Sequence, residues 1–177
     1  MRPARAAAAC VMVSALMSLP ASAGVIIQNP GFETGDFSGW TQFGDLSYTT
    51  VSPRAAHTGV YGAEFGPENS FGYISQTVDT TPGTLYDLSF WIHNTSGYGF
   101  VVFWGDGVED VIYSEGAAGY SWTKRSFEVL ASGFTTTFGF GFYNERSYYY
   151  FDDVSLEEAG AVLGVEKDAA VLAGRIE

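Results

Sequence analysis

The sequence predicts an all-β protein whose short strands form a sandwich or a barrel. Runs rich in Thr, Tyr, Phe and Val are separated by Gly, Asn, Asp and Pro at intervals of roughly ten residues, a rhythm typical of such folds. Between Gly24 and Glu158, no segment has the apolar repeat of a long amphipathic helix. We therefore expect about nine or ten strands within residues 24–157.

The strands follow from the apolar runs and from the turn residues between them. In chain order they are Val25–Gln28, Tyr48–Val51, Tyr61–Phe65, Gly72–Val78, Tyr86–Ile92, Phe100–Trp104, Val108–Tyr113, Ser126–Leu130, Thr135–Phe142 and Tyr148–Leu156. The fifth shows the clearest alternation, because Leu88, Phe90 and Ile92 fall on one face and Trp91 falls on the other.

The ninth expected strand has an unusual second face. Phe138, Phe140 and Phe142 line one side of it, while Gly139 and Gly141 leave the other side nearly bare. A strand face without side chains is typical of a place where another strand or a ligand approaches closely.

The first 23 residues have the order of a secretory signal peptide. Arg2 and Arg5 precede an apolar stretch from Ala6 to about Leu19, and Ala21-Ser22-Ala23 is a small-residue cleavage site. The apolar stretch is too short to span a bilayer, which argues against the alternative of a retained anchor helix. We expect residues 1–23 to be removed, 24–157 to form the domain, and 158–177 to form a tail that is a short helix or disordered.

Composition limits the partners of the exported domain. The formal net charge of the full chain is −12, and removal of Arg2 and Arg5 makes the mature chain more acidic still. Such a surface repels phosphate backbones and anionic lipid headgroups, so we expect no nucleic-acid binding and no stable membrane insertion after signal cleavage. Cys10 is the only cysteine, so the mature domain relies on its core, on a metal ion, or on both.

Five segments carry a family resemblance: Asn29–Trp40, His57–Ala63, Tyr86–Trp91, Trp122-Thr123 and Tyr150–Leu156. Together they resemble the galactose-binding-like jelly roll of carbohydrate-binding modules, over residues 25–157. The resemblance implies a two-sheet antiparallel β-sandwich. The N-terminal half also resembles exported bacterial proteins of the PEP-CTERM type, although the C-terminal segment lacks the Pro-Glu-Pro motif, the apolar span and the basic end of that sorting tail. We therefore expect a secreted or periplasmic protein.

The same resemblance implies a structural calcium ion bound by Glu33 and Asp152. Calcium takes six to eight oxygen ligands, and carboxylates supply them well. Asp152 shares an alternating face with Val154 and Leu156, which predicts an inward carboxylate that needs a cation or hydrogen-bond donors. The alternative for both residues is turn capping and an exposed edge.

A carbohydrate ligand would need flat aromatic rings beside polar side chains. The resemblance implies a site on the concave sheet face or in the loops at one rim. The candidate ligand-binding residues are Trp91, Asn94, Tyr98, Trp104, Tyr143, Asn144, Arg146 and Tyr148. The alternative for each aromatic residue is the core of the sandwich, whose inner faces require bulky side chains.

No motif for catalysis is present in the sequence. It contains no HExxH, Gly-x-Ser-x-Gly or P-loop pattern, and His57 and His93 have no metal-ligand spacing. We expect a non-catalytic module that binds a polysaccharide or glycan. The alternatives are a structural or adhesive surface protein that contacts other proteins, and a hydrolase with two carboxylates across a cleft.

Overall fold

The computed structural model describes residues 27–116, 118–145 and 147–159. These residues form ten strands and one short 3-10 turn, η1 (Pro53–Ala55). The strands are β1 (Thr41–Gly44), β2 (Thr50–Ser52), β3 (Gly62–Phe65), β4 (Gly72–Asp79), β5 (Leu85–Asn94), β6 (Gly99–Gly105), β7 (Val111–Glu115), β8 (Tyr120–Leu130), β9 (Thr135–Tyr143) and β10 (Tyr149–Glu158).

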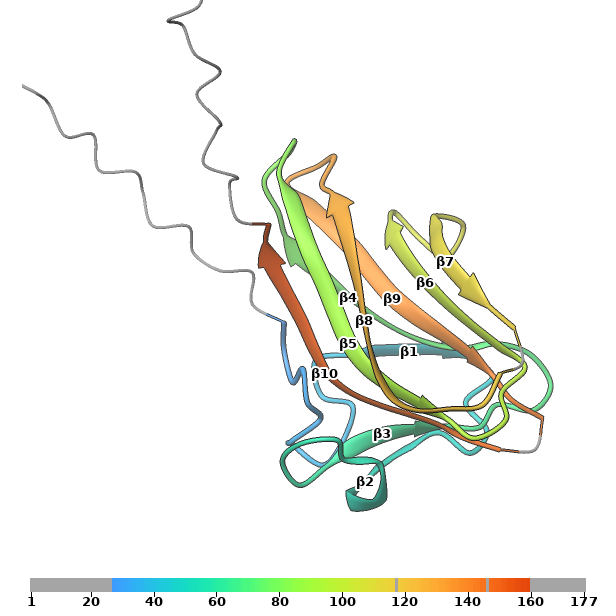
Figure 1. The fold of residues 1–177 in the computed structure, drawn as a ribbon. Coiled ribbons are helices and arrows are strands. Elements are labelled where there is room, and N and C mark those ends of the chain that lie inside the picture. Colours follow the sequence, from blue (N-terminus) through green and yellow to red (C-terminus); the bar gives the residue numbers. More distant parts are fainter. Residues whose placement is uncertain (1–26, 117, 146, 160–177) are drawn as a thin grey trace, which may run out of the picture.

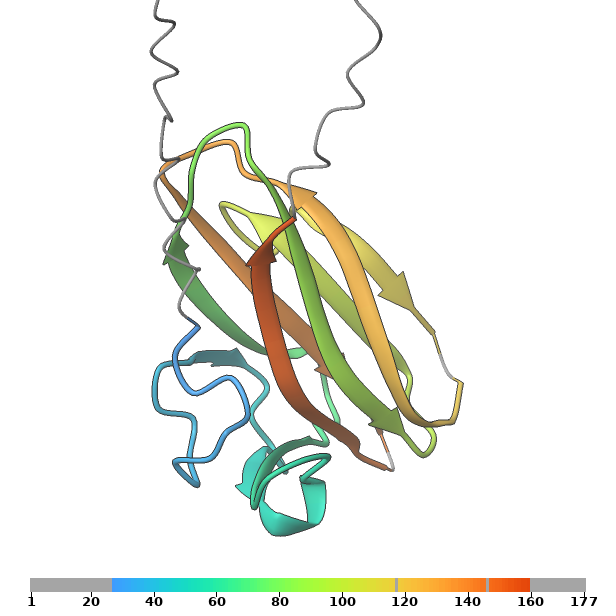
Figure 2. The same cartoon turned by 60° about the vertical axis from the view of Figure 1, so that its left-hand side comes forward.

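Two five-stranded sheets pack face to face (Figure 1 and Figure 2). Sheet A has the order β1-β4-β9-β6-β7, and sheet B has the order β2-β3-β10-β5-β8. Every strand pair is antiparallel. The predicted two-sheet antiparallel β-sandwich is thus confirmed, and the domain is a jelly roll. Within the described ranges, no helix is long and apolar enough to cross a membrane.

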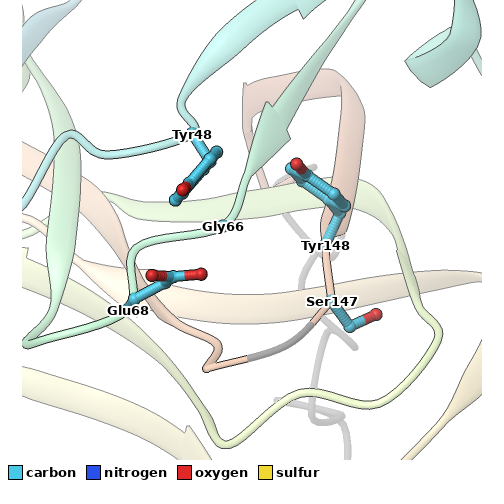
Figure 3. Close-up of a pocket in the computed structure, with 5 residues that line it drawn as sticks. All are labelled: Tyr48, Gly66, Glu68, Ser147 and Tyr148. Atoms are coloured by element: carbon cyan, nitrogen blue, oxygen red, sulfur yellow. The ribbon is translucent and has the colours of Figure 1, made fainter.

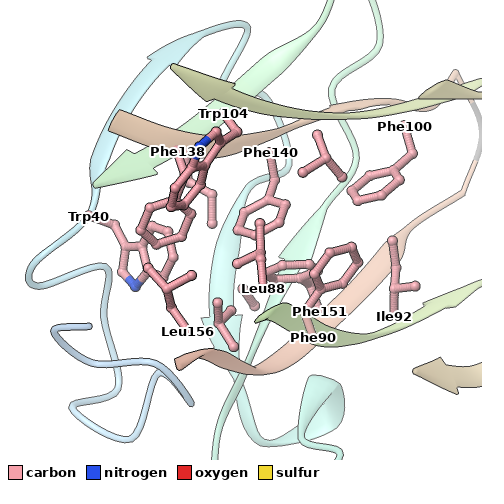
Figure 4. Packing of buried hydrophobic residues seen from close by; sticks show 14 of the residues in the cluster. Trp40, Leu88, Phe90, Ile92, Phe100, Trp104, Phe138, Phe140, Phe151 and Leu156 are labelled. Carbon is pink, nitrogen blue, oxygen red and sulfur yellow. The ribbon is translucent and has the colours of Figure 1, made fainter. Parts of the chain in front are cut away.

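The core between the sheets is unusually rich in phenylalanine (Figure 4). Phe138 and Phe140 of β9 and Phe90 of β5 are fully buried, as their alternation predicts. Phe65 stacks on Phe142 with ring centroids 3.8 Å apart. Burial of each such ring stabilises the fold by about 1.5–3 kcal/mol.

The first strand differs from the expectation. Ile27 and Gln28 lie in no strand, and the rest of the segment expected from residue 25 lies outside the described residues. Gln28 instead pairs with the Gln76 side chain, whose amide accepts from its backbone N–H at 3.0 Å and donates to its carbonyl at 2.7 Å. A side-chain amide therefore replaces a neighbouring strand. The true first strand, β1, has the short sequence Thr-Gln-Phe-Gly, which carries little apolar alternation.

The limits of three other strands also shift. β8 begins six residues before the expected start at Ser126, and β7 begins at Val111 because residues 106–110 form a turn. In that turn, the Asp110 carboxylate accepts from the Asp106 backbone N–H at 2.8 Å. β10 continues through Glu158, where the tail was expected to begin. The predicted signal peptide and most of the predicted tail lie outside the described residues.

Candidate functional site

Asp152 is a fully buried carboxylate in β10. Its Oδ2 accepts the backbone N–H groups of His57 at 2.8 Å and Thr58 at 3.1 Å, and its Oδ1 accepts that of Asp153 at 2.8 Å. Burial raises the pKa of the Asp152 carboxyl from 3.8 to about 6, against the lowering effect of these hydrogen bonds. Among the described residues, no lysine or arginine forms an ion pair with it.

The face on which Asp152 lies differs from the expectation. In the register between β10 and β5, Asp152 pairs with Trp91, which points away from the core. The register then shifts before Ser155, and Asp153 has a left-handed backbone with φ of 52°. This bulge breaks the alternation that links Asp152 to Leu156. Asp152 is buried by the loop that begins at His57, not by the core.

Glu33 binds the same loop from the opposite end of the chain. Its carboxylate accepts the backbone N–H groups of Val60 at 3.0 Å and Tyr61 at 3.1 Å. A Cβ atom added to Gly59 would lie 2.1 Å from Glu33 Oε1, so only glycine permits this approach. Glu33 and Asp152 thus fasten one loop to two distant parts of the chain.

Three acidic residues surround Gly31. A Cβ atom added there would lie 3.5 Å from Asp152 Oδ1, 3.8 Å from Glu33 Cγ and 3.9 Å from Asp153 Oδ1. Asp153 in turn contacts the His57 ring, with 2.6 Å between Oδ2 and Nδ1. The two predicted metal ligands, Glu33 and Asp152, thus both hold the loop near Gly31, but no group of three or more His, Cys, Asp or Glu side chains in the described part of the chain is arranged to hold a metal ion.

Trp104, a candidate platform residue, belongs to the core. It is 8% exposed and packs against the buried rings of Tyr86 and Phe138. Its indole Nε1–H donates to the Leu130 carbonyl at 2.9 Å. A place in the core was the alternative given above for each aromatic candidate. Trp104 is therefore not available at the surface for a ligand.

Two of the candidate polar residues are also buried. The Asn94 side chain donates to the Ala118 carbonyl at 2.9 Å, which fixes the loop between β7 and β8. Asn144 is fully buried, and its backbone N–H donates to the Pro67 carbonyl at 2.8 Å. Arg146 lies outside the described residues.

Tyr98 and Tyr143 do come together, on the outer face of sheet A. Their ring centroids are 5.9 Å apart, and the Tyr143 ring also contacts Phe71 at 5.8 Å. Phe71 lies 5.9 Å from Tyr73, which stacks on Phe43 at 4.9 Å with an interplanar angle of 10°. We call these five rings the sheet A platform.

Glycines in sheet A allow aromatic rings to lie close to the outer face. The three ring-and-glycine pairs are Phe71 over Gly99, Tyr73 over Gly141, and Phe103 over Gly139, where an added Cβ would approach the ring to 2.8, 2.5 and 2.4 Å. The face that the sequence left bare is thus covered by side chains of the neighbouring strands. Rings held in this way are pre-positioned, because little conformational freedom is left for a ligand to remove.

A small pocket lies in the loops at one rim of the sandwich (Figure 3). Its volume is about 210 Å³, and it is lined by Tyr48, Gly66, Glu68, Ser147 and Tyr148. Tyr48 has a left-handed backbone with φ of 51° and is 59% exposed. Such a conformation is costly for a tyrosine and is typical of functional loops.

Asp45 holds the loops on either side of this pocket. Its carboxylate accepts the backbone N–H and the hydroxyl of Ser47 at 2.9 and 2.6 Å, and the backbone N–H of Asn69 at 2.9 Å. These hydrogen bonds, first those from Ser47, hold the pKa of Asp45 well below its usual range. The pocket is therefore preorganised by a charged group that does not line it.

The remaining candidate, Trp91, lies on the outer face of sheet B and stacks on His57 at 4.1 Å. The candidate residues thus divide between sheet A, the rim pocket, sheet B and the core. The sequence analysis missed Phe43, Phe71 and Tyr73 of the platform. The only sequence signal for that surface was the bare strand face at Gly139 and Gly141. The rings that cover this face come from neighbouring strands, and the order of strands in the sheet cannot be read from the sequence.

The fold is shared with known solved structures. The chain is similar to TmCBM61 in complex with β-1,4-galactotriose, with a TM-score of 0.60 and 24% identity over 74% of this chain and 96% of that one. It is also similar to a family 16 carbohydrate-binding module, with a TM-score of 0.55 and 21% identity over 75% and 99% of the two chains. A third is the K3 adhesin domain of Lys-gingipain from Porphyromonas gingivalis, with a TM-score of 0.57 and 17% identity over 75% and 98%.

No protein-family profile matches the sequence, and no curated protein matches it. At these identities, the similarity to solved structures shows the jelly-roll fold. The function must be inferred from the residues of the site.

Proposed function

We propose that this protein is an exported, non-catalytic carbohydrate-binding module that holds a glycan on the sheet A platform. The observation that carries the proposal is the run of contacting rings from Phe43 to Tyr98, laid over glycine backbone. The C–H face of a sugar ring stacks on such flat, apolar surfaces, while its hydroxyls bind polar side chains. Glu145 supplies one such group beside the platform, where it accepts from the Tyr143 hydroxyl at 2.6 Å.

The similarity to TmCBM61 and to the family 16 module supports this assignment, since both are carbohydrate-binding modules. Export is supported by the order of charged, apolar and small residues over positions 1–23. The non-catalytic assignment is supported by the absence of catalytic motifs from the sequence.

The proposal includes a structural calcium ion held by Glu33 and Asp152, with Asp153 as a further donor. It is supported by the chemistry of the donors, since these residues offer only oxygen and Asp152 is a buried carboxylate without a positively charged partner in the described part of the chain. Bound calcium would neutralise that charge and join β10 to the segment before β1.

The test is binding of the purified protein to a panel of neutral polysaccharides that includes β-1,4-galactan, with calcium present. We expect saturable binding to one class of glycan, and Tyr73→Ala is expected to weaken it at least tenfold. Phe134→Ala is the matched control, since Phe134 is 81% exposed but lies outside the platform. Failure of the folded protein to bind any glycan would favour a structural or adhesive role.

A further inference from the structure

A second series of aromatic rings crosses the outer face of sheet B, on the side of the sandwich opposite the platform. Consecutive rings contact one another in the order Tyr148, Tyr150, His93, Trp122, His57 and Trp91, with centroid distances between 4.1 and 6.5 Å. We call these six rings the sheet B track. None of them is fully buried, so the track forms part of the surface.

Strand register explains why these rings share one face. Tyr150 pairs with His93 between β10 and β5. The adjacent pair in the register, Phe151 and Ile92, points into the core, so Tyr150 and His93 point outward. At the rim, the Arg54 guanidinium lies 5.3 Å from the Tyr148 ring and 5.7 Å from the Tyr150 ring. The rings are thus fixed by the sheet and by a cation that packs on two of them.

A hollow lies at each end of the track. One is the rim pocket of Figure 3, in which Tyr148 stands opposite Tyr48. The other has a volume of about 370 Å³ and lies over three serines of β5, β8 and β10, whose small side chains leave space above the sheet. It is lined by Asp87, Ser89, Lys124, Ser126, Ser155 and Glu157.

The second hollow is continuous with the track. Trp91 pairs directly with Lys124 across β5 and β8, and it follows Ser89 on the same face of β5 by two residues. From Asp87 to His93, β5 covers about 20 Å at ~3.3 Å per residue. The surface is therefore long enough for an extended ligand rather than a single small molecule.

The side chains of this surface suit a neutral polysaccharide. Flat rings lie beside hollows lined by hydroxyl, carboxylate and ammonium groups, the combination that binds sugar rings and their hydroxyls. Asp87 and Glu157 disfavour an anionic ligand at the second hollow. Among the described strands of sheet B, the exposed leucines, which a protein partner would bury, lie at the far end of this face, where Leu85 pairs with Leu130.

We propose that the sheet B track is a second carbohydrate-binding surface, so that one domain holds two glycan chains on its opposite faces. This inference rests on the proposed function and extends it from binding to cross-linking. Two sites on one rigid domain also raise the apparent affinity for a dense polysaccharide, because the second contact becomes intramolecular.

The four tryptophans offer a test that needs no substitution in the track. Trp91 and Trp122 lie on the track, whereas Trp40 and Trp104 are buried and serve as internal references. Oxidation by N-bromosuccinimide should modify the first two, and neutral oligosaccharides of β-1,4-linked galactose, xylose or glucose should protect them. Protection should persist in Tyr73→Ala, which lacks the platform contact. Absence of protection by an oligosaccharide that the protein binds would overturn the inference.

Calorimetry on the same oligosaccharides separates the two proposals. We expect two sites per chain in the unsubstituted protein, and one site each in Tyr73→Ala and Trp122→Ala. A single site that is lost in Tyr73→Ala and unchanged in Trp122→Ala would overturn the second surface and leave the platform. A single site lost only in Trp122→Ala would support the track and overturn the platform. No binding at all would overturn both.

Discussion

The buried carboxylate of Asp152 should make the stability of this domain depend on pH in an unusual direction. Its pKa is raised from 3.8 to about 6 in the folded protein, so the folded state binds a proton at Asp152 more tightly than the unfolded chain does. Its contribution to stability is fully present below about pH 4 and is lost as the pH rises through 6. A rise of this size corresponds to about 3 kcal/mol at 1.36 kcal/mol per pKa unit.

The assay is thermal unfolding of the wild type and of Asp152→Asn, between pH 4.5 and 7.5, in a chelator. Other carboxyl groups titrate in both proteins, so the difference between their Tm values isolates Asp152. Between pH 4.5 and 7.5 about 2 kcal/mol of this contribution is lost, which for a domain of this size corresponds to a change of about 6 °C in that difference. We expect the wild type to lose stability relative to Asp152→Asn as the pH rises. Glu128→Gln, an exposed carboxylate on β8, is the control and should track the wild type.

Calcium should remove this loss, because a bound cation favours the ionised carboxylate. At pH 7.5 we expect calcium to raise the Tm of the wild type and to leave Asp152→Asn nearly unchanged. The increment should shrink towards pH 5, where Asp152 becomes protonated. A difference between the two proteins that stays constant across this pH range, with and without calcium, would refute the reasoning.

Two further predictions concern the sheets. Gly141→Ala places its Cβ 2.5 Å from the Tyr73 ring and should weaken glycan binding severalfold with little loss of Tm, whereas Gly139→Ala meets the Ile74 carbonyl at 2.4 Å and should cost about 1–3 kcal/mol. Equal Tm losses in both variants would contradict this distinction. Trp104→Ala should destabilise the fold by about 3–5 kcal/mol in denaturant unfolding, because it empties a core position. If Trp104→Ala instead kept its stability and lost only glycan binding, Trp104 would be a ligand-binding residue and not a core residue.

The fold could be predicted from local patterns because side-chain alternation is strong where both the core and the solvent face are well defined. The run of Leu88, Phe90 and Ile92 identified β5, and Phe138, Phe140 and Phe142 identified the inner face of β9. The sequence did not predict β1, because this strand has only four residues and lies at the edge of sheet A, where no run of buried residues is required. The face of Asp152 was wrongly inferred because a bulge changes the alternation without any signal in residue type.

The candidate site was only partly accessible to sequence reasoning. Tyr98 and Tyr143 lie near loops that the sequence delimits, but Phe71 and Tyr73, at the start of β4, come about 70 residues before Tyr143 in the chain. Which rings become neighbours depends on the order of strands in the sheet. That order is set by packing across the whole sandwich, and no local pattern encodes it.

The position of β10 in sheet B has a consequence for the order of folding. β10 is the last strand in the described chain, yet it lies between β3 and β5 in the middle of the sheet (Figure 2). Without it, sheet B would consist of two separate strand pairs, β2 with β3 and β5 with β8. Completion of sheet B therefore waits until residues 149–158 have been synthesised, in whatever order the earlier strands pair.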